Sequence, residues 1–249
     1  MSDENTTTMK AISQDTLGAP EVLQEVEVPR PKPGIGQIVV AVHAAGLNPT
    51  DYKHRSSGLF LGEPPFVLGW DVSGVVEAVG LGVALFKPGD EVLGMLPYPY
   101  GAGSHAEYVA GPARAFVPKP AGLSHVEAGA LPLVGLTAWQ ALVDIVLDTL
   151  GGEDRLRSLD VLKPGGILVS LLPGQFGDVA ARAAELGVRA TDMLVEHDQA
   201  GMRAVTELVE SGKLKVHVAD TYPLAEAAKA HAEGDTGRVT GKLVLTVRP

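Results

Sequence analysis

The sequence predicts a chain of two parts, an irregular β domain followed by an α/β domain that is shorter than usual. Short apolar runs broken by proline and glycine fill the amino-terminal half, a pattern typical of strands joined by tight turns. Three β-branched runs then alternate with helical patterns between residues 145 and 211, which indicates a parallel sheet. Between the two parts, a helical pattern runs directly into a strand pattern, so little room remains for a connecting segment.

Composition excludes several classes of function. The 249 residues carry a formal charge of -10, and clustered Lys and Arg are missing, so we expect no nucleic-acid partner. There is no cysteine, which excludes disulfides, thiolate zinc sites and a cysteine nucleophile. The seven histidines show no paired spacing, and we predict no metal. No apolar run reaches the roughly 20 residues of a membrane span, so we expect a cytoplasmic protein with no membrane partner.

The amino-terminal half predicts a closed or sandwiched β-sheet. Apolar alternation marks its strands, which are bounded by Pro29, Pro31, Pro33 and the Lys87–Asp90 turn. The predicted strands are Met9–Ser13, Val22–Val28, Gln37–Ala45, Val72–Val79, Glu91–Met95 and His105–Ala110.

One segment of this half, Leu47–Phe60, is unusually rich in polar side chains. Asn48, Asp51 and Tyr52 fall within five residues of each other, which favours a functional site. The alternative is a solvated turn and helix cap, because Asn-Pro and Thr-x-Asp are good turn and cap signals. The pattern alone does not separate the two.

The carboxyl-terminal part begins with a helical pattern at Leu131–Val143, in which Leu136, Trp139, Gln140 and Val143 recur about one turn apart. We interpret it as a buried helix. The alternating elements after it are strands at 145–150, 166–172 and 189–194, and helices at 153–162, 178–186 and 199–211.

Several motifs carry a family resemblance. They are AAGLNPTDYKHRSSG, Gly69-Trp70-Asp71, VGLGVALFKPGDEVLG, GSHAEYVAG, LPLVGLTAWQAL, VLDTLGG, LKPGGILVS and GRVTGKLVL. From Met9 to Val247 the chain thereby resembles the zinc-free quinone oxidoreductase branch of the medium-chain dehydrogenase/reductase (MDR) superfamily. Zinc-dependent relatives have a Cys at the place of Asn48 and a His at the place of Trp70.

The resemblance implies a fold and an activity. Residues 9–124 and 213–249 correspond to a GroES-like irregular β-barrel domain, and residues 125–212 to a Rossmann-like domain. The family reduces quinones or α,β-unsaturated carbonyls with NADPH. It also forms homodimers by pairing the last strand of the Rossmann sheet, which corresponds to Arg189–Leu194 here.

The chain departs from the family after LTAWQAL. A strand, a GxxGxxG turn and two further strand-helix units are missing, which is roughly 60 to 70 residues. Only strands 4-5-6 of the Rossmann order remain, so we expect impaired NADPH binding. Gly101–Ala106 (GAGSHA) is a poor substitute because no helix follows it, and Gly174–Gly177 is a better nest. The 145–150 strand becomes an exposed edge, to be covered by the 131–143 helix or a second chain unless the monomer is poorly soluble.

The resemblance also implies roles for individual residues. The expected catalytic group is Tyr52, Asn48 and Asp51. The expected cofactor-binding residues are Asn48, Thr137, Asp148, Ser170, Leu171, Gly174 and Lys242. Structural alternatives exist for three of them, because Thr137 could bond its own helix backbone, Asp148 could cap the next helical turn, and Lys242 could be a solvated strand residue.

Aromatic residues offer a further hypothesis. A wall for a flat substrate and an ordinary core are both open alternatives for Phe60, Phe66, Trp70, Tyr98 and Tyr100.

Three classes of function remain open from the sequence. We favour an NADPH-dependent quinone or enone oxidoreductase. The second is a non-catalytic binding or structural derivative, or an engineered deletion, of such an enzyme. The third is non-redox chemistry, such as proton transfer by Tyr52 and Asp51, in the β-domain cleft.

Overall fold

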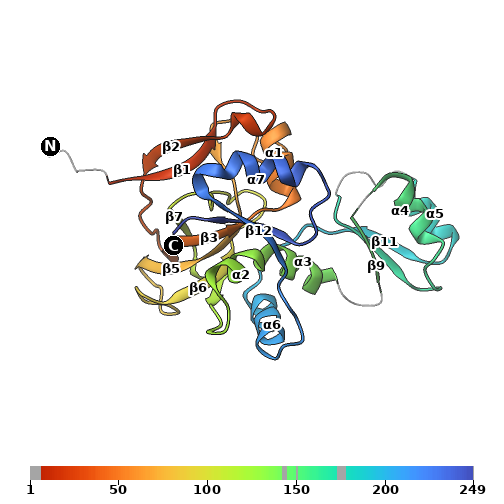
Figure 1. Ribbon diagram of the computed structural model, residues 1–249. Coiled ribbons are helices and arrows are strands. Elements are labelled where there is room, and N and C mark those ends of the chain that lie inside the picture. The colour runs from red at the N-terminus through yellow and green to blue at the C-terminus, as the bar shows by residue number, and fades with distance from the viewer. Residues whose placement is uncertain (1–6, 142–144, 150, 173–177, 249) are drawn as a thin grey trace. The chain divides into compact units, whose positions relative to one another are not determined.

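The computed structural model describes residues 7–141, 145–149, 151–172 and 178–248, and it divides into two compact units (Figure 1). Unit 1 comprises Met1–Leu136 and His197–Pro249, and unit 2 comprises Thr137–Glu196. The division from sequence placed 125–212 in the Rossmann-like part, and this domain boundary stays a prediction. Helix α2 (His125–Ala130) packs on the large sheet of unit 1. Helix α6 (Gln199–Glu210) also joins unit 1, where Gln199 Nε2 donates a 2.9 Å hydrogen bond to Phe116 O.

A large sheet forms the centre of unit 1. Strand β3 (Gln37–Gly46) runs through its middle, and its interior residues are almost all buried because apolar side chains face both layers. The sheet order is β12-β13-β3-β5-β6-β8, with β7 also paired to β3. The other strands are β5 (Asp71–Val79), β6 (Glu91–Met95), β7 (Tyr108–Pro112), β8 (Phe116–Pro118), β12 (Val218–Pro223) and β13 (Lys242–Thr246).

A smaller antiparallel sheet and two helices complete unit 1. Its order is β2-β1-β4, and it shares an apolar core with helix α7 that includes Leu68, Leu224, Ala230 and Leu245. The elements are β1 (Thr8–Gln14), β2 (Gln24–Pro29), β4 (Phe66–Val67), helices α1 (Pro49–Ser57) and α7 (Ala227–Asp235), and the 3-10 turns Pro20–Val22, Ala113–Ala115 and Leu224–Glu226.

The predicted strands are confirmed with two differences. The His105–Ala110 strand begins later, at Tyr108, because His105 N donates to Leu68 O and Ala106 bridges to Ala11 of β1. The sheet is also open: in the described residues β12 and β8 are its outer strands and do not pair, so the GroES-like domain is not a closed barrel.

Unit 2 is a three-stranded parallel sheet, as predicted. Its order is β11-β10-β9, with Ile167 opposite both Ile145 and Arg189. Leu159, Leu168, Val179, Ala183 and Val188 form its core. The elements are β9 (Ile145–Asp148), α4 (Gly152–Leu159), β10 (Ile167–Ser170), α5 (Val179–Glu185) and β11 (Arg189–Asp192). Within the described part of the sheet, β9 and β11 are the edges, and the homodimer stays a prediction.

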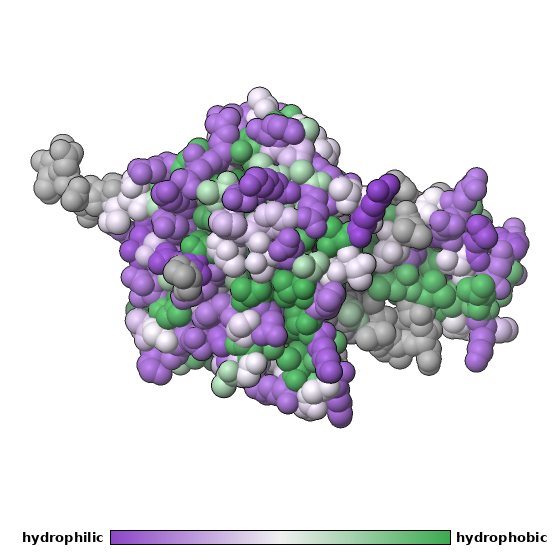
Figure 2. All heavy atoms as spheres, in the orientation of Figure 1, coloured by the Kyte–Doolittle hydropathy of each residue, from purple (hydrophilic) through white to green (hydrophobic). Residues whose placement is uncertain are grey.

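The predicted 131–143 helix is present as α3 (Pro132–Ala141), and Val143 lies outside the described residues. Leu136 is buried as expected, but 45% of Trp139 is exposed, so the apolar face is only partly covered. No described helix is long and apolar enough to cross a membrane. On the face of unit 1 in view, Figure 2 shows hydrophobic residues gathered near α2 and α6 within a mainly hydrophilic surface.

Candidate active site

The predicted site residues Asn48, Asp51 and Lys242 converge in unit 1, and Asp71 joins them. We call these four the Asn48 cluster. The start of α1 supplies Asn48, its N-cap, and Asp51, and the starts of β5 and β13 supply Asp71 and Lys242. Asn48, Asp51 and Asp71 are at most 2% exposed, so the cluster is a polar centre inside the domain.

Asn48 and Asp51 are held by the first turn of α1. Asn48 is the N-cap in extended backbone, and Pro49 follows at the first helical position, where its missing N–H costs nothing. The Asp51 carboxylate reaches back and accepts a 2.6 Å hydrogen bond from Asn48 N. The predicted cap was therefore correct, and it also positions the candidate site.

Asp71 was not among the predicted site residues, although the Gly69-Trp70-Asp71 motif contains it. Asn48 Nδ2 donates to its Oδ2 at 3.0 Å, and the backbone N–H of Leu133 at the start of α3 donates to its Oδ1 at 2.7 Å. Gly46 makes room for this contact, because a Cβ there would lie 2.5 Å from Gly129 O and 2.7 Å from Asp71 Oδ2. Any side chain at position 46 would displace Asp71 or α2.

Lys242, the first residue of β13, is the fourth member of the cluster. Its Nζ donates to Leu47 O at 2.6 Å and to Asn48 Oδ1 at 2.5 Å, and it lies 3.6 Å from Asp71 Oδ2. Only 15% of its side chain is exposed, which contradicts the alternative of a solvated strand residue. Its ammonium thus orients the Asn48 amide and offsets one carboxylate charge.

The two carboxyl groups have unusual proton affinities. Burial raises the pKa of Asp51 to about 7, and the Asp71 charge adds to this, while the Asn48 N–H and Lys242 oppose it. Burial likewise raises the pKa of Asp71 and lowers that of Lys242. Asp51 Oδ1 is buried without a partner among the described residues. Asp51 can therefore hold or release a proton near neutral pH.

We expect Asp51→Asn to change how stability depends on pH. Between pH 3.8 and about 7 the folded chain keeps a proton on Asp51 that the unfolded chain has lost. Wild-type stability from this group is therefore fully present below pH 3.8 and is lost as pH rises to about 7. The unfolding free energy of the variant minus that of the wild type should therefore rise by roughly 2–4 kcal/mol from pH 4 to pH 8, because only the wild type loses stability over this range.

Urea titrations at several pH values measure this difference. Asp15→Asn, at an exposed carboxyl group of the same unit, is the matched control. A constant difference for Asp51→Asn across the range would contradict the raised pKa.

Tyr52 lies beside the Asn48 cluster in sequence but faces another element. Its ring contacts His231 of α7 edge-on, with centroids 5.1 Å apart, and its hydroxyl lies against Gly234. It also packs on the apolar core around Leu224, and burial raises its pKa. The structure thus gives Tyr52 a packing role between α1 and α7, and its catalytic role stays a prediction.

The aromatic side chains pack mainly on each other. Trp70 is fully buried, and its ring lies 5.2 Å from Tyr98 and 4.9 Å from His54. Phe60 contacts His54 and Tyr98, Phe66 packs on the β1 core, and Tyr100 is 78% exposed. These contacts favour the core interpretation over a substrate wall for all but Tyr100.

Unit 1 also contains a buried polar group that no sequence pattern predicted, which consists of Arg55, Ser104, His105 and His231. The rings of His105 and His231 are 5.6 Å apart, and Arg55 Nη1 lies 3.2 Å from His231 Nδ1. Arg55 Nη2 also binds Asp235 at 2.7 Å. Burial lowers the pKa of His105 to about 3 and that of His231 well below its usual value, so both are neutral. His105 and His231 are far apart in the sequence, so no local pattern predicts that they lie together.

In unit 2, Asp148 is bonded to Ser170 and to Arg155, a residue that we did not predict. Arg155 is 1% exposed, and its Nε donates to Asp148 Oδ2 at 2.5 Å. Ser170 Oγ donates to the same oxygen at 2.8 Å, and Gly151 N donates to Oδ1 at 2.8 Å. The Gly151 bond holds the turn that leads into α4, but it is not the helix cap considered as the alternative for Asp148, because Gly151 is itself the N-cap of α4 and no side chain caps this helix. A ribose role for this carboxylate stays a prediction, and its two oxygens already accept at least three hydrogen bonds from described residues.

The remaining predicted cofactor residues lie on separate elements of the chain. Thr137 is half-buried in α3, and Leu171 follows β10, where its N–H donates to Asp148 O at 2.9 Å. Gly174 lies outside the described residues. The rejected GAGSHA segment is a loop whose amides at Gly103 and Ser104 bind Gly69 O, so these two amides are not free for phosphate.

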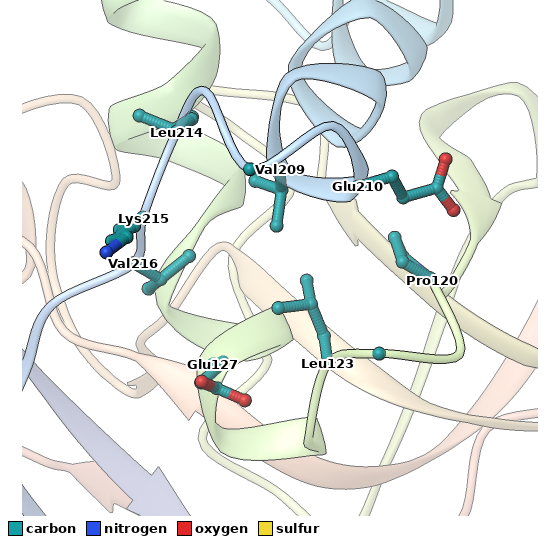
Figure 3. A pocket seen from close by; sticks show the side chains of 10 residues that line it. Pro120, Leu123, Glu127, Val209, Glu210, Leu214, Lys215 and Val216 are labelled. Carbon is teal, nitrogen blue, oxygen red and sulfur yellow. The ribbon is translucent and has the colours of Figure 1, made fainter.

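A surface hollow of about 420 Å³ lies elsewhere in unit 1. Figure 3 shows Leu123, Val209, Leu214 and Val216 around it, with Glu127 and Glu210 at its margin. It shares no residue with the Asn48 cluster. Among the described residues, no three His, Cys, Asp or Glu side chains are grouped to hold a metal ion.

Two family models match the chain. Residues 34–121 match the alcohol dehydrogenase GroES-like domain, and residues 131–245 match a model described as zinc-binding dehydrogenase. A chloroplastic quinone oxidoreductase, QR1, of Triphysaria versicolor is 34% identical over 186 residues, which cover 72% of this chain and 53% of the relative. The chain spans about half the length of the plant relatives it matches.

Two further comparisons cover more of the relatives. The mitochondrial NAD(P)H oxidoreductase RTN4IP1 of Danio rerio is 26% identical over 327 positions, covering 85% of this chain and 84% of the relative. The solved quinone oxidoreductase of Coxiella burnetii is 29% identical with a TM-score of 0.91, covering 97% of this chain and all of that one. The chain therefore belongs to the quinone oxidoreductase-like family of the MDR superfamily.

Proposed function

We propose that this chain descends from zinc-independent quinone or enone oxidoreductases. It retains the GroES-like domain, which we call the substrate-side domain, and it binds NADPH weakly. The observation that carries the proposal is the junction between α3 and β9. Helix α3 ends at Ala141 and β9 begins at Ile145, so only residues 142–144 separate them. A mononucleotide-binding half needs a strand, a glycine-rich turn and a helix at this point, which is roughly 30 residues for each βαβ unit.

Two further observations support weak cofactor binding. The match to the Danio rerio relative extends over 327 positions, more than the 249 residues of this chain, so that relative has residues with no counterpart here. In unit 2, the Asp148 carboxylate is engaged by Arg155, Ser170 and Gly151 instead of facing a ribose with free acceptors. The residues present therefore do not fit the diphosphate and adenosine end of a dinucleotide.

Zinc independence is supported by the state of Asn48 and Trp70. Both Asn48 side-chain atoms are engaged, by Asp71 and by Lys242, and Trp70 is a fully buried member of an aromatic core. Neither offers a metal ligand. A carbonyl substrate would instead depend on hydrogen bonds and on a proton held at Asp51, and a bound nicotinamide would supply the hydride.

The second candidate is a non-catalytic binding protein of the same descent. The missing half favours it too, because a domain that has lost cofactor affinity can still bind a small molecule. Non-redox chemistry by Tyr52 and Asp51 has less support, since the Tyr52 hydroxyl lies against Gly234 of α7.

Quinone-dependent NADPH oxidation separates these candidates. With a soluble naphthoquinone, we expect the rate to be negligible at micromolar NADPH and to rise without saturation into the millimolar range. A rate that saturates at micromolar NADPH would contradict impaired binding while leaving the oxidoreductase assignment intact. No protein-dependent rate at any NADPH concentration would contradict catalysis and favour the binding protein.

A further inference from the structure

Helix α7 lies beside α1 (Figure 1) and is held there by a buried guanidinium as well as by apolar packing. Arg55, in the last turn of α1, is 3% exposed, and its Nη2 donates a 2.7 Å hydrogen bond to Asp235 Oδ2 of α7. Its Nε donates to Gly18 O at 3.1 Å, and its Nη1 lies 3.2 Å from Nδ1 of His231, which is also in α7. One side chain of α1 therefore makes two polar contacts to α7.

The contact between Arg55 and His231 determines which imidazole nitrogen carries the proton. A guanidinium has only donors, so Nη1 can bond to Nδ1 only when that nitrogen has no proton and accepts. A proton on Nδ1 would place two donors 3.2 Å apart, and its charge would lie beside the charge of Arg55. The closed position of α7 therefore selects the neutral form of His231.

A second imidazole, that of His105, lies next to the first. Both rings are fully buried, and their centroids are 5.6 Å apart with the ring planes perpendicular. His231 Nε2 and both nitrogens of His105 have no hydrogen-bond partner among the described residues. Burial is the main cause that lowers the pKa of His105, to about 3, and that of His231, well below its usual value. A proton on either ring would add a buried charge, since Asp235 already pairs with Arg55.

Tyr52 of α1 also contacts His231, edge-on and with centroids 5.1 Å apart. Burial raises the pKa of its hydroxyl, so Tyr52 is neutral in acid. The other charged and titratable groups on α7 and on the elements packed against it are exposed or bonded to other partners. Exposed are Glu21, Lys53 and Asp220, and the bonded pairs are Asp51 with Asn48, Lys242 with Asn48, His54 with Thr50, Lys229 with Glu226, and Tyr222 with Glu233.

We propose that Arg55, His105 and His231 form a pH-sensitive switch that holds α7 on unit 1 when both imidazoles are neutral and releases it when they are protonated. In the released state the imidazoles reach water, where a histidine takes up its proton near pH 6.5. The neutral imidazoles therefore contribute their full stability above pH 6.5, and this contribution is lost as the pH falls below that value. The inference concerns α7 and does not rest on the proposed oxidoreductase function.

Hydrogen exchange of the full chain from pH 7 to pH 5, corrected for the intrinsic rate at each pH, tests the proposal. Because opening takes up at least one proton, the protection factors of the α7 amides should fall about tenfold or more between pH 6 and pH 5. The β3 amides, in the middle of the large sheet, should stay better protected than those of α7 throughout. Protection of α7 that is independent of pH, or equal to that of β3 at pH 5, would overturn the proposal.

A double variant identifies the groups that titrate. His105→Gln with His231→Gln removes both imidazoles, while the amide oxygen at position 231 can still accept from Arg55. The pH dependence of α7 protection should then disappear. His217→Gln, at an exposed histidine of the same unit, is the matched control and should keep the wild-type dependence. A double variant that retains the wild-type dependence would show that other groups cause it and would contradict the proposal.

A measurement on the wild type covers the case in which the double variant does not fold, which circular dichroism reveals. Nitrogen-15 NMR of the imidazoles should show that His231 carries its proton on Nε2, and none on Nδ1, at pH 7. A proton on Nδ1 at pH 7, or a charged His231 at pH 5 while α7 keeps its full protection, would also overturn the proposal.

Discussion

Replacing Arg155 with Met is expected to destabilise unit 2 by about 3–5 kcal/mol, because it leaves the buried Asp148 carboxylate without its charge partner. Arg155 and Asp148 are 1% and 5% exposed. The guanidinium also donates to Leu172 O at 3.3 Å, so one side chain from α4 bonds to the ends of both β9 and β10. A single domain has only roughly 5–15 kcal/mol of stability, so this loss is large enough to open the three-stranded sheet.

Hydrogen exchange of the backbone amides measures this effect for each unit separately. Amides of β10 should lose protection in Arg155→Met, while those of β3 in unit 1 should keep it. Arg157→Met is the matched control, since Arg157 lies on the same helix, is 81% exposed and pairs with Asp154 at 3.5 Å. Protection of β10 equal to wild type in Arg155→Met would show that the ion pair does not support the sheet.

Arg155 shows what a sequence pattern leaves out. The strands and helices of unit 2 were predicted because their periods of hydrophobicity are local properties of the chain. Helix α4 has the sequence GEDRLRSL, in which Arg155 and Arg157 look alike. Only the packing of α4 over β9 makes one of them fully buried and leaves the other in solvent.

The same limit applies to the candidate active site. Asn48 and Asp51 were identified as site candidates by the density of polar residues around them and by the family resemblance, and the turn and cap signals predicted that they lie at a helix start. Lys242 was found through the resemblance alone, since it reaches Asn48 from a strand 194 residues later. The side chain of Tyr52 packs against α7, which is also far away in the sequence, and no local pattern encodes that contact.

Weak NADPH binding is the second large effect that we expect. An intact dinucleotide site gains affinity at the diphosphate end from backbone N–H groups at a helix N-terminus, and at the nicotinamide end from side chains. Because only residues 142–144 separate α3 from β9, we expect the first of these ends to be missing. Losing two or three charge-assisted contacts of about 1.5–3 kcal/mol each lowers affinity by about three decades or more.

Isothermal titration calorimetry of the purified full chain with NADPH tests the central claim most directly, namely that the substrate-side domain persists without a working dinucleotide site. We predict no saturable heat at micromolar NADPH and a dissociation constant of about 1 mM or weaker. One-to-one binding with a micromolar dissociation constant would contradict this claim, because another element of the chain would then have to replace the missing half.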